Sequence, residues 1–221
     1  MADNTLQADW IILLKTNLDL IVPDFVAADL LWYPVEGDPK TRAAPDCLVA
    51  FGRPKGYRGS YKQWEEDKIA PQIVMEVLSP GNRYGEMANK LSFYDRFGVE
   101  EYFVIDPYDN SLAVHVRRDG HLQLVPEWEG FASPRLGIRF ERPAGALRVL
   151  GPDGSPFTDL ATERARAALA AKSAEQEKTR AEQEKTRAEQ EKTRAEKQQQ
   201  RADALAARLR AMGVDPDQID S

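Results

Sequence analysis

Helical spacing of apolar side chains marks two segments in the first hundred residues. Residues 4–22 repeat apolar side chains at mostly three- and four-residue intervals, begin with polar residues suited to an N-cap, and are followed by Pro23. Residues 83–97 carry one apolar stripe and end before Gly98, a residue suited to the left-handed conformation that stops many helices. The pattern therefore predicts two amphipathic helices, over 4–22 and 83–97.

Runs of apolar and β-branched residues predict strands around these helices. Residues 72–78 are apolar on both alternating faces apart from Glu76, the pattern of a strand covered on both sides. A helix separates this strand from the next, which favours parallel pairing. We expect strands over 25–33, 47–51, 72–78 and 101–105, a hairpin formed by 111–117 and 121–125, short strands up to about residue 154, and a loop or hairpin arm over 52–67.

Helix-forming residues dominate from Asp159 onward, and three copies of AEQEKTR fill residues 174–194. The repeats place a single apolar residue, alanine, in each heptad, whereas a coiled-coil seam needs two. Oppositely charged side chains three or four residues apart stabilise the helix itself. Two interpretations stay open: a solvated single helix, or self-association through the alanine stripe, helped by Leu205, Leu209 and Met212.

Composition separates a globular part from this appendage. Between Lys172 and Arg201 the only apolar residues are four alanines, so that stretch has no core of its own. A chain of the size of the preceding part buries roughly 70% of its unfolded surface, which is enough for an independent core. We place one globular domain at residues 1–158 and a helical extension at 159–221.

Charge and cysteine content narrow the function classes. The formal net charge is −6, and residues 1–171 carry 19 basic and 25 acidic side chains. This balance disfavours a protein that coats nucleic acid through its overall charge, while leaving room for a local basic rim. The single cysteine, Cys47, excludes an internal disulfide and a multi-cysteine metal site. With no apolar run of membrane-spanning length and no signal-peptide pattern, we expect a cytoplasmic protein.

Two acidic residues at strand positions are the main chemical signal. Glu76 stands in an apolar strand, where an ionised carboxylate needs a lysine, a proton or a metal ion, unless it reaches solvent or pairs with an arginine. Asp46 directly precedes the strand over 47–51. Two such carboxylates together with a backbone carbonyl suit Mg²⁺ or Mn²⁺.

A lysine on the second predicted helix completes the set. Lys90 falls inside the apolar stripe of residues 83–97, so its ammonium is expected to point toward the sheet that carries Glu76. There it would orient a water or stabilise developing negative charge on a phosphate. The alternative is a simple ion pair with Glu86, four residues earlier.

Several short motifs follow one another in a fixed order from residue 44 to residue 107. They are Ala44-Pro45-Asp46 with Phe51-Gly52, Ser60-Tyr61-Lys62-Gln63-Trp64-Glu65-Glu66, Met75-Glu76-Val77-Leu78-Ser79-Pro80, Glu86-x-x-x-Lys90-x-x-x-Tyr94, and Gly98-Val99-Glu100-Glu101-Tyr102-Phe103-Val104-Ile105-Asp106-Pro107. Over about residues 5–160 the chain thereby resembles the Uma-type putative restriction endonuclease family of the PD-(D/E)XK nuclease superfamily.

The resemblance implies a restriction-endonuclease-like α/β core, with a central mixed sheet flanked by helices. It implies that Asp46, Glu76 and the carbonyl of Val77 bind Mg²⁺ or Mn²⁺, and that Lys90 is the active-site lysine. Leu78 occupies the position of the superfamily's usual lysine, so Lys90 must act from the following helix. The implied reaction is metal-assisted hydrolysis of DNA phosphodiester bonds.

Basic side chains near these motifs are predicted to hold the nucleic-acid backbone, although a solvated basic loop is the alternative. The predicted contacts are Arg53, Lys55, Arg58, Lys62 and Arg83. We therefore expect a magnesium-dependent endonuclease acting on DNA, whose C-terminal helix serves self-association or partner binding. Leu78 and the acidic net charge favour a second class, a catalytically degenerate binding module. A third is a scaffold in which the repeat helix is the functional part.

Overall fold

The computed structural model describes residues 2–81 and 84–212. The chain divides into two compact units, Met1–Asp159 and Leu160–Ser221, and each is described by itself.

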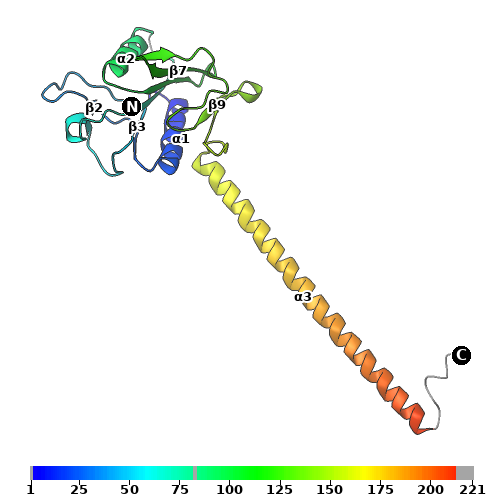
Figure 1. The fold of residues 1–221 in the computed structure, drawn as a ribbon. Helices are drawn as coiled ribbons and strands as arrows, with labels where there is room; N and C mark the ends of the chain where they lie inside the picture. The colour runs from blue at the N-terminus through cyan, green and yellow to red at the C-terminus, as the bar shows by residue number, and fades with distance from the viewer. Residues whose placement is uncertain (1, 82–83, 213–221) are drawn as a thin grey trace. The chain divides into compact units, whose positions relative to one another are not determined.

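A six-stranded mixed sheet forms the centre of the first unit (Figure 1). Its strand order is β1-β3-β5-β6-β7-β8; only β5 and β6 pair in parallel, and all other neighbours are antiparallel. The strands are β1 (Phe25–Ala27), β3 (Cys47–Ala50), β5 (Ile73–Val77), β6 (Glu101–Asp106), β7 (Ser111–Arg118) and β8 (His121–Leu124). Two small sheets pair β2 (Trp32–Tyr33) with β4 (Tyr61–Lys62), and β9 (Arg139–Glu141) with β10 (Arg148–Leu150).

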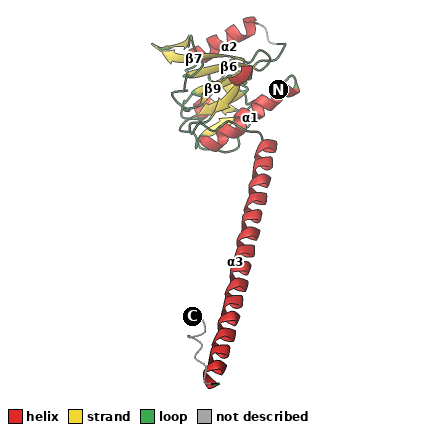
Figure 2. Ribbon diagram, turned by 90° about the vertical axis from the view of Figure 1, so that its right-hand side faces the viewer, coloured by secondary structure: helices red, strands yellow, loops and turns green. Residues whose placement is uncertain are grey.

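Helices cover opposite faces of the central sheet, as the ribbons in Figure 2 show. The buried residues of α1 (Thr5–Ile21) pack with Ile73, Met75 and Val77 of β5. Tyr94 of α2 (Tyr84–Arg96) packs with Val74, which points to the other side because strand side chains alternate. Position 76 therefore faces α2. The predicted fold class, an α/β fold whose central mixed sheet is flanked by helices, is confirmed.

Most predicted elements agree with the structure. Both amphipathic helices, the parallel pairing of β5 with β6 and the β7–β8 hairpin are confirmed. The prediction of one strand over 25–33 is wrong: the chain leaves the sheet after β1, passes Asp29 in the left-handed region at φ 51°, and re-forms the separate β2. The polar excursion after β3 contains β4 and a short 3₁₀ helix, η1 (Gln63–Glu65).

The start of α1 is fixed by its N-cap. The Asn4 side chain accepts the Gln7 backbone N–H at 3.1 Å and also the Tyr108 hydroxyl at 2.9 Å. Replacing Asn4 with alanine should lower the free energy of unfolding by about 1 kcal/mol, because helix N–H groups then lose their side-chain acceptor. Urea denaturation measures this change. Thr16→Ala, at an exposed position of the same helix, is the control and should change stability by less than about 0.5 kcal/mol; an equal loss in both variants would contradict the capping role.

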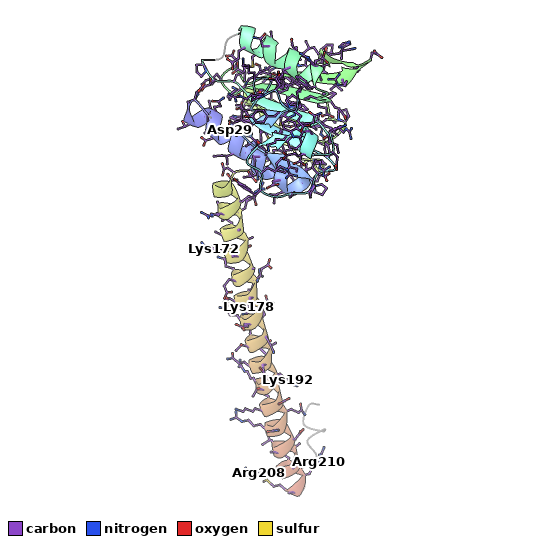
Figure 3. The ribbon with its side chains drawn as sticks, turned by 90° about the vertical axis from the view of Figure 1, so that its left-hand side faces the viewer. Asp29, Lys172, Lys178, Lys192, Arg208 and Arg210 are labelled. Carbon is purple, nitrogen blue, oxygen red and sulfur yellow. The ribbon has the colours of Figure 1, made fainter. Side chains whose placement is uncertain are left out.

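The second unit contains one continuous helix, α3 (Leu160–Ala211). Figure 3 labels basic side chains along it, from Lys172 to Arg210, which project outward from the helix. Ion pairs four residues apart run along its surface, such as Arg180 with Glu184 at 3.4 Å. These contacts stabilise the helix locally, so self-association through the alanine stripe stays a prediction. In the part of the chain that the structure describes, no helix is long and apolar enough to cross a membrane.

Candidate active site

Neighbouring strands bring the two predicted carboxylates together. β3 and β5 are antiparallel with Cys47 opposite Met75, and this register places Asp46 beside Glu76. Both side chains face α2, and both are buried, with exposed fractions of 8% for Asp46 and 1% for Glu76. The alternative in which Glu76 reaches solvent is therefore wrong.

Helix α2 places two polar side chains over Glu76. The Lys90 ammonium lies 2.8 Å from Glu76 Oε2, whereas Glu86 is 3.9 Å away. The Tyr94 hydroxyl donates a hydrogen bond to Glu76 Oε1. Because residues four apart share a helix face, Lys90 and Tyr94 both reach the same carboxylate. The Lys90 ammonium thus contacts Glu76 more closely than Glu86.

The opposite helix fixes the backbone at the end of β5. Gln7 of α1 donates from Nε2 to the Val77 carbonyl at 2.7 Å, and both groups are buried. The Val77 N–H in turn donates to Asp46 Oδ2 at 2.7 Å. A carbonyl oxygen has two lone pairs, so Val77 keeps acceptor capacity beyond the bond from Gln7.

These groups line a cavity of about 190 Å³. Among the described residues, its walls carry five carboxylate side chains and one ammonium, that of Lys90, and this balance favours a bound cation. The lining residues are Asp3, Gln7, Asp29, Ala44, Asp46, Glu76, Val77, Leu78, Glu86, Met87 and Lys90.

Burial and the closeness of charged groups shift the pKa values of the side chains in this cavity. Burial, together with the Asp46 charge, raises the pKa of Glu76 to about 7, although Lys90 and Tyr94 act to lower it. Burial also raises the pKa of Asp46, which the Val77 N–H and a hydrogen bond with Glu76 lower in part. Burial lowers the pKa of Lys90, but the charge and hydrogen bond of Glu76, together with the charges of Asp46 and Glu86, outweigh it and the net direction is upward. Near neutral pH, then, Glu76 is poised between its two protonation states while Lys90 is charged.

The Glu76 shift predicts a stability effect that depends on pH. Its folded pKa of about 7 lies above the ordinary value of 4.5, so the unfolded chain releases this proton first as pH rises. Wild type should therefore lose stability between those two pH values. A Glu76→Gln variant cannot ionise there, and its stability advantage should grow by on the order of 2–3 kcal/mol from about pH 5 to pH 8. Urea denaturation in a metal chelator measures this gain; an advantage that does not change with pH would contradict the raised pKa.

The donor set fits a magnesium-type ion. Within residues 2–81 and 84–212, no three His, Cys, Asp or Glu side chains converge to bind a metal by themselves. Mg²⁺, however, is held in many enzymes by one or two carboxylates, with water and substrate phosphate as the other ligands. Asp46 and Glu76, which crowd each other in a buried cavity, supply two carboxylates, and the Val77 carbonyl supplies a third oxygen.

Of the predicted nucleic-acid contacts, none of the four that the structure describes lines this cavity. Lys55 contacts Asp19 near the end of α1, whereas Gln7, which lines the cavity, lies near the start of that helix. At 1.5 Å per residue these two positions are about 18 Å apart along α1. Four of the predicted nucleic-acid contacts make ion pairs with acidic side chains: Arg53 with Glu66 and Asp67, Lys55 with Asp19, Arg58 with Glu66, and Lys62 with Glu65. Arg83 lies outside the described residues. A role for these residues in binding nucleic acid stays a prediction.

Two residues of the site were not identified from the sequence. Tyr94 stands in the apolar stripe and in the motif Glu86-x-x-x-Lys90-x-x-x-Tyr94 with no role assigned to it, although its four-residue spacing from Lys90 signals a shared target. Gln7 is a polar residue on the buried face of α1, which is the signal that would have marked it.

Three comparisons with known proteins complete the description of the site. A family model, Uma2, described as a putative restriction endonuclease, matches residues 6–136. Among solved structures, one similar chain is a putative nuclease from Anabaena variabilis ATCC 29413, with 15% identity and a TM-score of 0.40. That match covers 58% of this chain and 69% of the other. No curated protein matches.

Proposed function

The chain belongs to the Uma2 family of putative restriction endonucleases, and we propose that it is a Mg²⁺-dependent endonuclease that hydrolyses phosphodiester bonds of DNA. The family supports a nuclease-like function. The metal and the substrate are inferred from the cavity, where Asp46, Glu76 and Lys90 meet. The observation that carries the proposal is the placement of two buried carboxylates and a charged lysine around one small space.

In this proposal Asp46, Glu76 and the Val77 carbonyl hold the ion. When bound, Mg²⁺ would polarise the phosphate, acidify an attacking water and stabilise the leaving oxygen. The protein keeps these ligands in position: the Val77 N–H orients Asp46, Gln7 orients the Val77 carbonyl, and Tyr94 holds one oxygen of Glu76. Binding of a cation would also replace the proton that Glu76 retains near neutral pH.

Lys90 acts as a charged hydrogen-bond donor in this scheme. Because the charge of Glu76 raises its pKa, the ammonium keeps its proton and is a poor base. A fixed positive charge beside the ligands is suited to stabilising negative charge that develops on a phosphate oxygen. Leu78, which also lines the cavity, supplies no such charge, so Lys90 takes the role of the superfamily's lysine from α2.

Removing the Tyr94 hydroxyl should weaken catalysis without abolishing it. Tyr94→Phe leaves one oxygen of Glu76 without its donor, so the carboxylate is less well oriented. Loss of such an outer contact typically costs about 10–100-fold in metal affinity or activity. The measurement is the Mg²⁺ concentration that gives half-maximal cleavage, together with the maximal rate. Tyr57→Phe, at a residue that is 97% exposed, is the matched control and should behave as wild type.

Cleavage of supercoiled plasmid tests the proposal. Wild type should convert the plasmid to nicked or linear DNA with Mg²⁺ or Mn²⁺, and excess chelator should stop the reaction. If wild type leaves the plasmid intact with both ions yet binds DNA with a steep salt dependence, the chain is a binding module and the nuclease proposal is wrong.

The remaining assignments belong to the same proposal. We place the nuclease domain at residues 1–158 and treat residues 159–221 as a helical extension, with α3 as a self-association or partner-binding element. A cytoplasmic location fits a substrate of DNA and a cofactor of Mg²⁺. Truncation before α3 tests the role of the extension. A lower oligomeric mass with unchanged cleavage would show that α3 serves self-association and not catalysis.

A further inference from the structure

A second cavity opens beside the small β2–β4 sheet. Its volume is about 370 Å³, within the range of small-molecule sites. Two half-buried aromatic rings, Tyr33 and Trp64, contribute to its walls, together with the polar side chains of Ser60 and Lys62. The other lining residues are Gly37, Asp38 and Pro39. Aromatic rings next to a lysine are the usual elements of a site that stacks a nucleobase.

One short segment of chain connects this cavity with the carboxylate cavity. Asp38 and Pro39 line the aromatic cavity, and Ala44 and Asp46 line the other. Pro39 and Asp46 are seven residues apart, so the chain between them spans at most about 25 Å. That reach corresponds to a few nucleotides of an extended strand.

The connecting segment carries two exposed cations, Lys40 and Arg42. Among the described residues, neither side chain makes an ion pair, in contrast to the basic residues of the loop that follows β3. Ala43 pairs with Trp32 as an isolated bridge, and Arg42 stands two residues before Ala44, which lines the carboxylate cavity. The Arg42 guanidinium is therefore available to a phosphate next to the carboxylate cavity.

Asp38, the acidic residue next to those cations in sequence, is engaged within its own turn. The Asp38 carboxylate accepts hydrogen bonds from the Thr41 hydroxyl at 2.6 Å and from the backbone N–H groups of Lys40 and Thr41. These bonds lower the pKa of Asp38 and use its oxygens within the turn. The side chains of Lys40 and Arg42 stay free for an external anion.

We propose that residues 38–46 and the aromatic cavity form a track for single-stranded nucleic acid that leads into the carboxylate cavity. Arg42 and Lys40 bind phosphates, and a base stacks against Tyr33 and Trp64. The proposal rests on the proposed nuclease function and adds the form of the substrate. An unpaired stretch of strand is required in the track, because in a duplex the base faces are already stacked on their neighbours. Supercoiled plasmid offers such stretches where the duplex opens locally, so plasmid nicking still reports cleavage.

Binding of fluorescent oligonucleotides to the full-length chain tests the track. Anisotropy is measured in a metal chelator, so that no cleavage intervenes. Wild type should bind single-stranded DNA more tightly than the duplex, and Trp64→Ala should weaken single-strand binding about 10-fold, the effect of one lost stacking contact. Trp64→Phe, which keeps an aromatic face, should stay within about threefold of wild type. Arg42→Gln should weaken binding and reduce the salt slope by about 1.

Matched variants outside the track test its specificity. Tyr57→Ala and Arg118→Gln alter an exposed aromatic ring and an exposed cation elsewhere, and both should bind as wild type. Normal binding by Trp64→Ala and Arg42→Gln would overturn the track, and plasmid cleavage by wild type would then show that the nuclease proposal still stands. A wild type that neither binds oligonucleotides nor cleaves plasmid would overturn both.

Discussion

Glu76→Gln should lower the rate of plasmid nicking by about 10³-fold or more. Glu76 is 1% exposed, faces Asp46, and supplies one of the two carboxylates proposed to hold the ion. The amide keeps the size of the side chain and can accept from Lys90 through its oxygen while its NH2 donates to the Tyr94 hydroxyl, but it carries no charge to neutralise a divalent cation. The measurement is the initial nicking rate at saturating Mg²⁺ and about pH 8.

Two controls distinguish a loss of catalysis from the loss of a nearby negative charge and from unfolding. Glu86→Gln removes a half-exposed carboxylate from the same cavity and should retain activity within about tenfold of wild type, because Glu86 is not a proposed ligand. Urea denaturation of Glu76→Gln at the assay pH is the second control: a stability at least similar to that of wild type would exclude unfolding as the cause of its inactivity. Full activity of Glu76→Gln, or an equal loss in both variants, would contradict the proposed ligand role.

Lys90→Met should lower the maximal rate by about 10²–10³-fold while Mn²⁺ still binds. Methionine preserves much of the aliphatic length but removes the ammonium that lies 2.8 Å from Glu76. Stabilisation of charge on the reacting phosphate is lost, whereas the carboxylates remain. A lower maximal rate with unchanged Mn²⁺ affinity distinguishes this role from that of a merely structural ion pair, whose loss would lower both.

The control for this prediction is Lys15→Met, which removes a lysine paired with Asp19 on the surface of α1. Its nicking rate should match that of wild type. If Lys90→Met loses metal binding and rate together, Lys90 supports the ligands and does not act on the phosphate.

The sequence predicted the core of the site because local rules govern it. Strand alternation placed Glu76 in a buried position, and helical periodicity placed Lys90 on the face of α2 that meets it. The contact between Asp46 and Glu76 required only that β3 pair with β5, which the structure shows. The resemblance of the motifs to a nuclease family is the basis for the chemistry proposed for these residues.

Residues that depend on long-range packing could not be predicted in the same way. Gln7 reaches Val77 from a helix seventy positions earlier in the chain, so no local spacing signals the contact. The single strand expected over 25–33 failed because Asp29 takes a left-handed conformation that the apolar pattern does not encode. The basic residues of the loop after β3 form ion pairs with acidic side chains such as Glu66. The number of basic residues in the sequence does not reveal these partners.

The measurement that tests the central claim most directly is calorimetric titration of Mn²⁺ into wild type and Asp46→Asn at about pH 8. Asp46 is buried beside Glu76 and the Val77 N–H, so it is the other proposed carboxylate ligand. We predict saturable binding to wild type, and binding at least about tenfold weaker in Asp46→Asn, because the variant lacks one of the two proposed carboxylate ligands. Equal binding by the two proteins, or none by wild type, would contradict a metal site between β3 and β5.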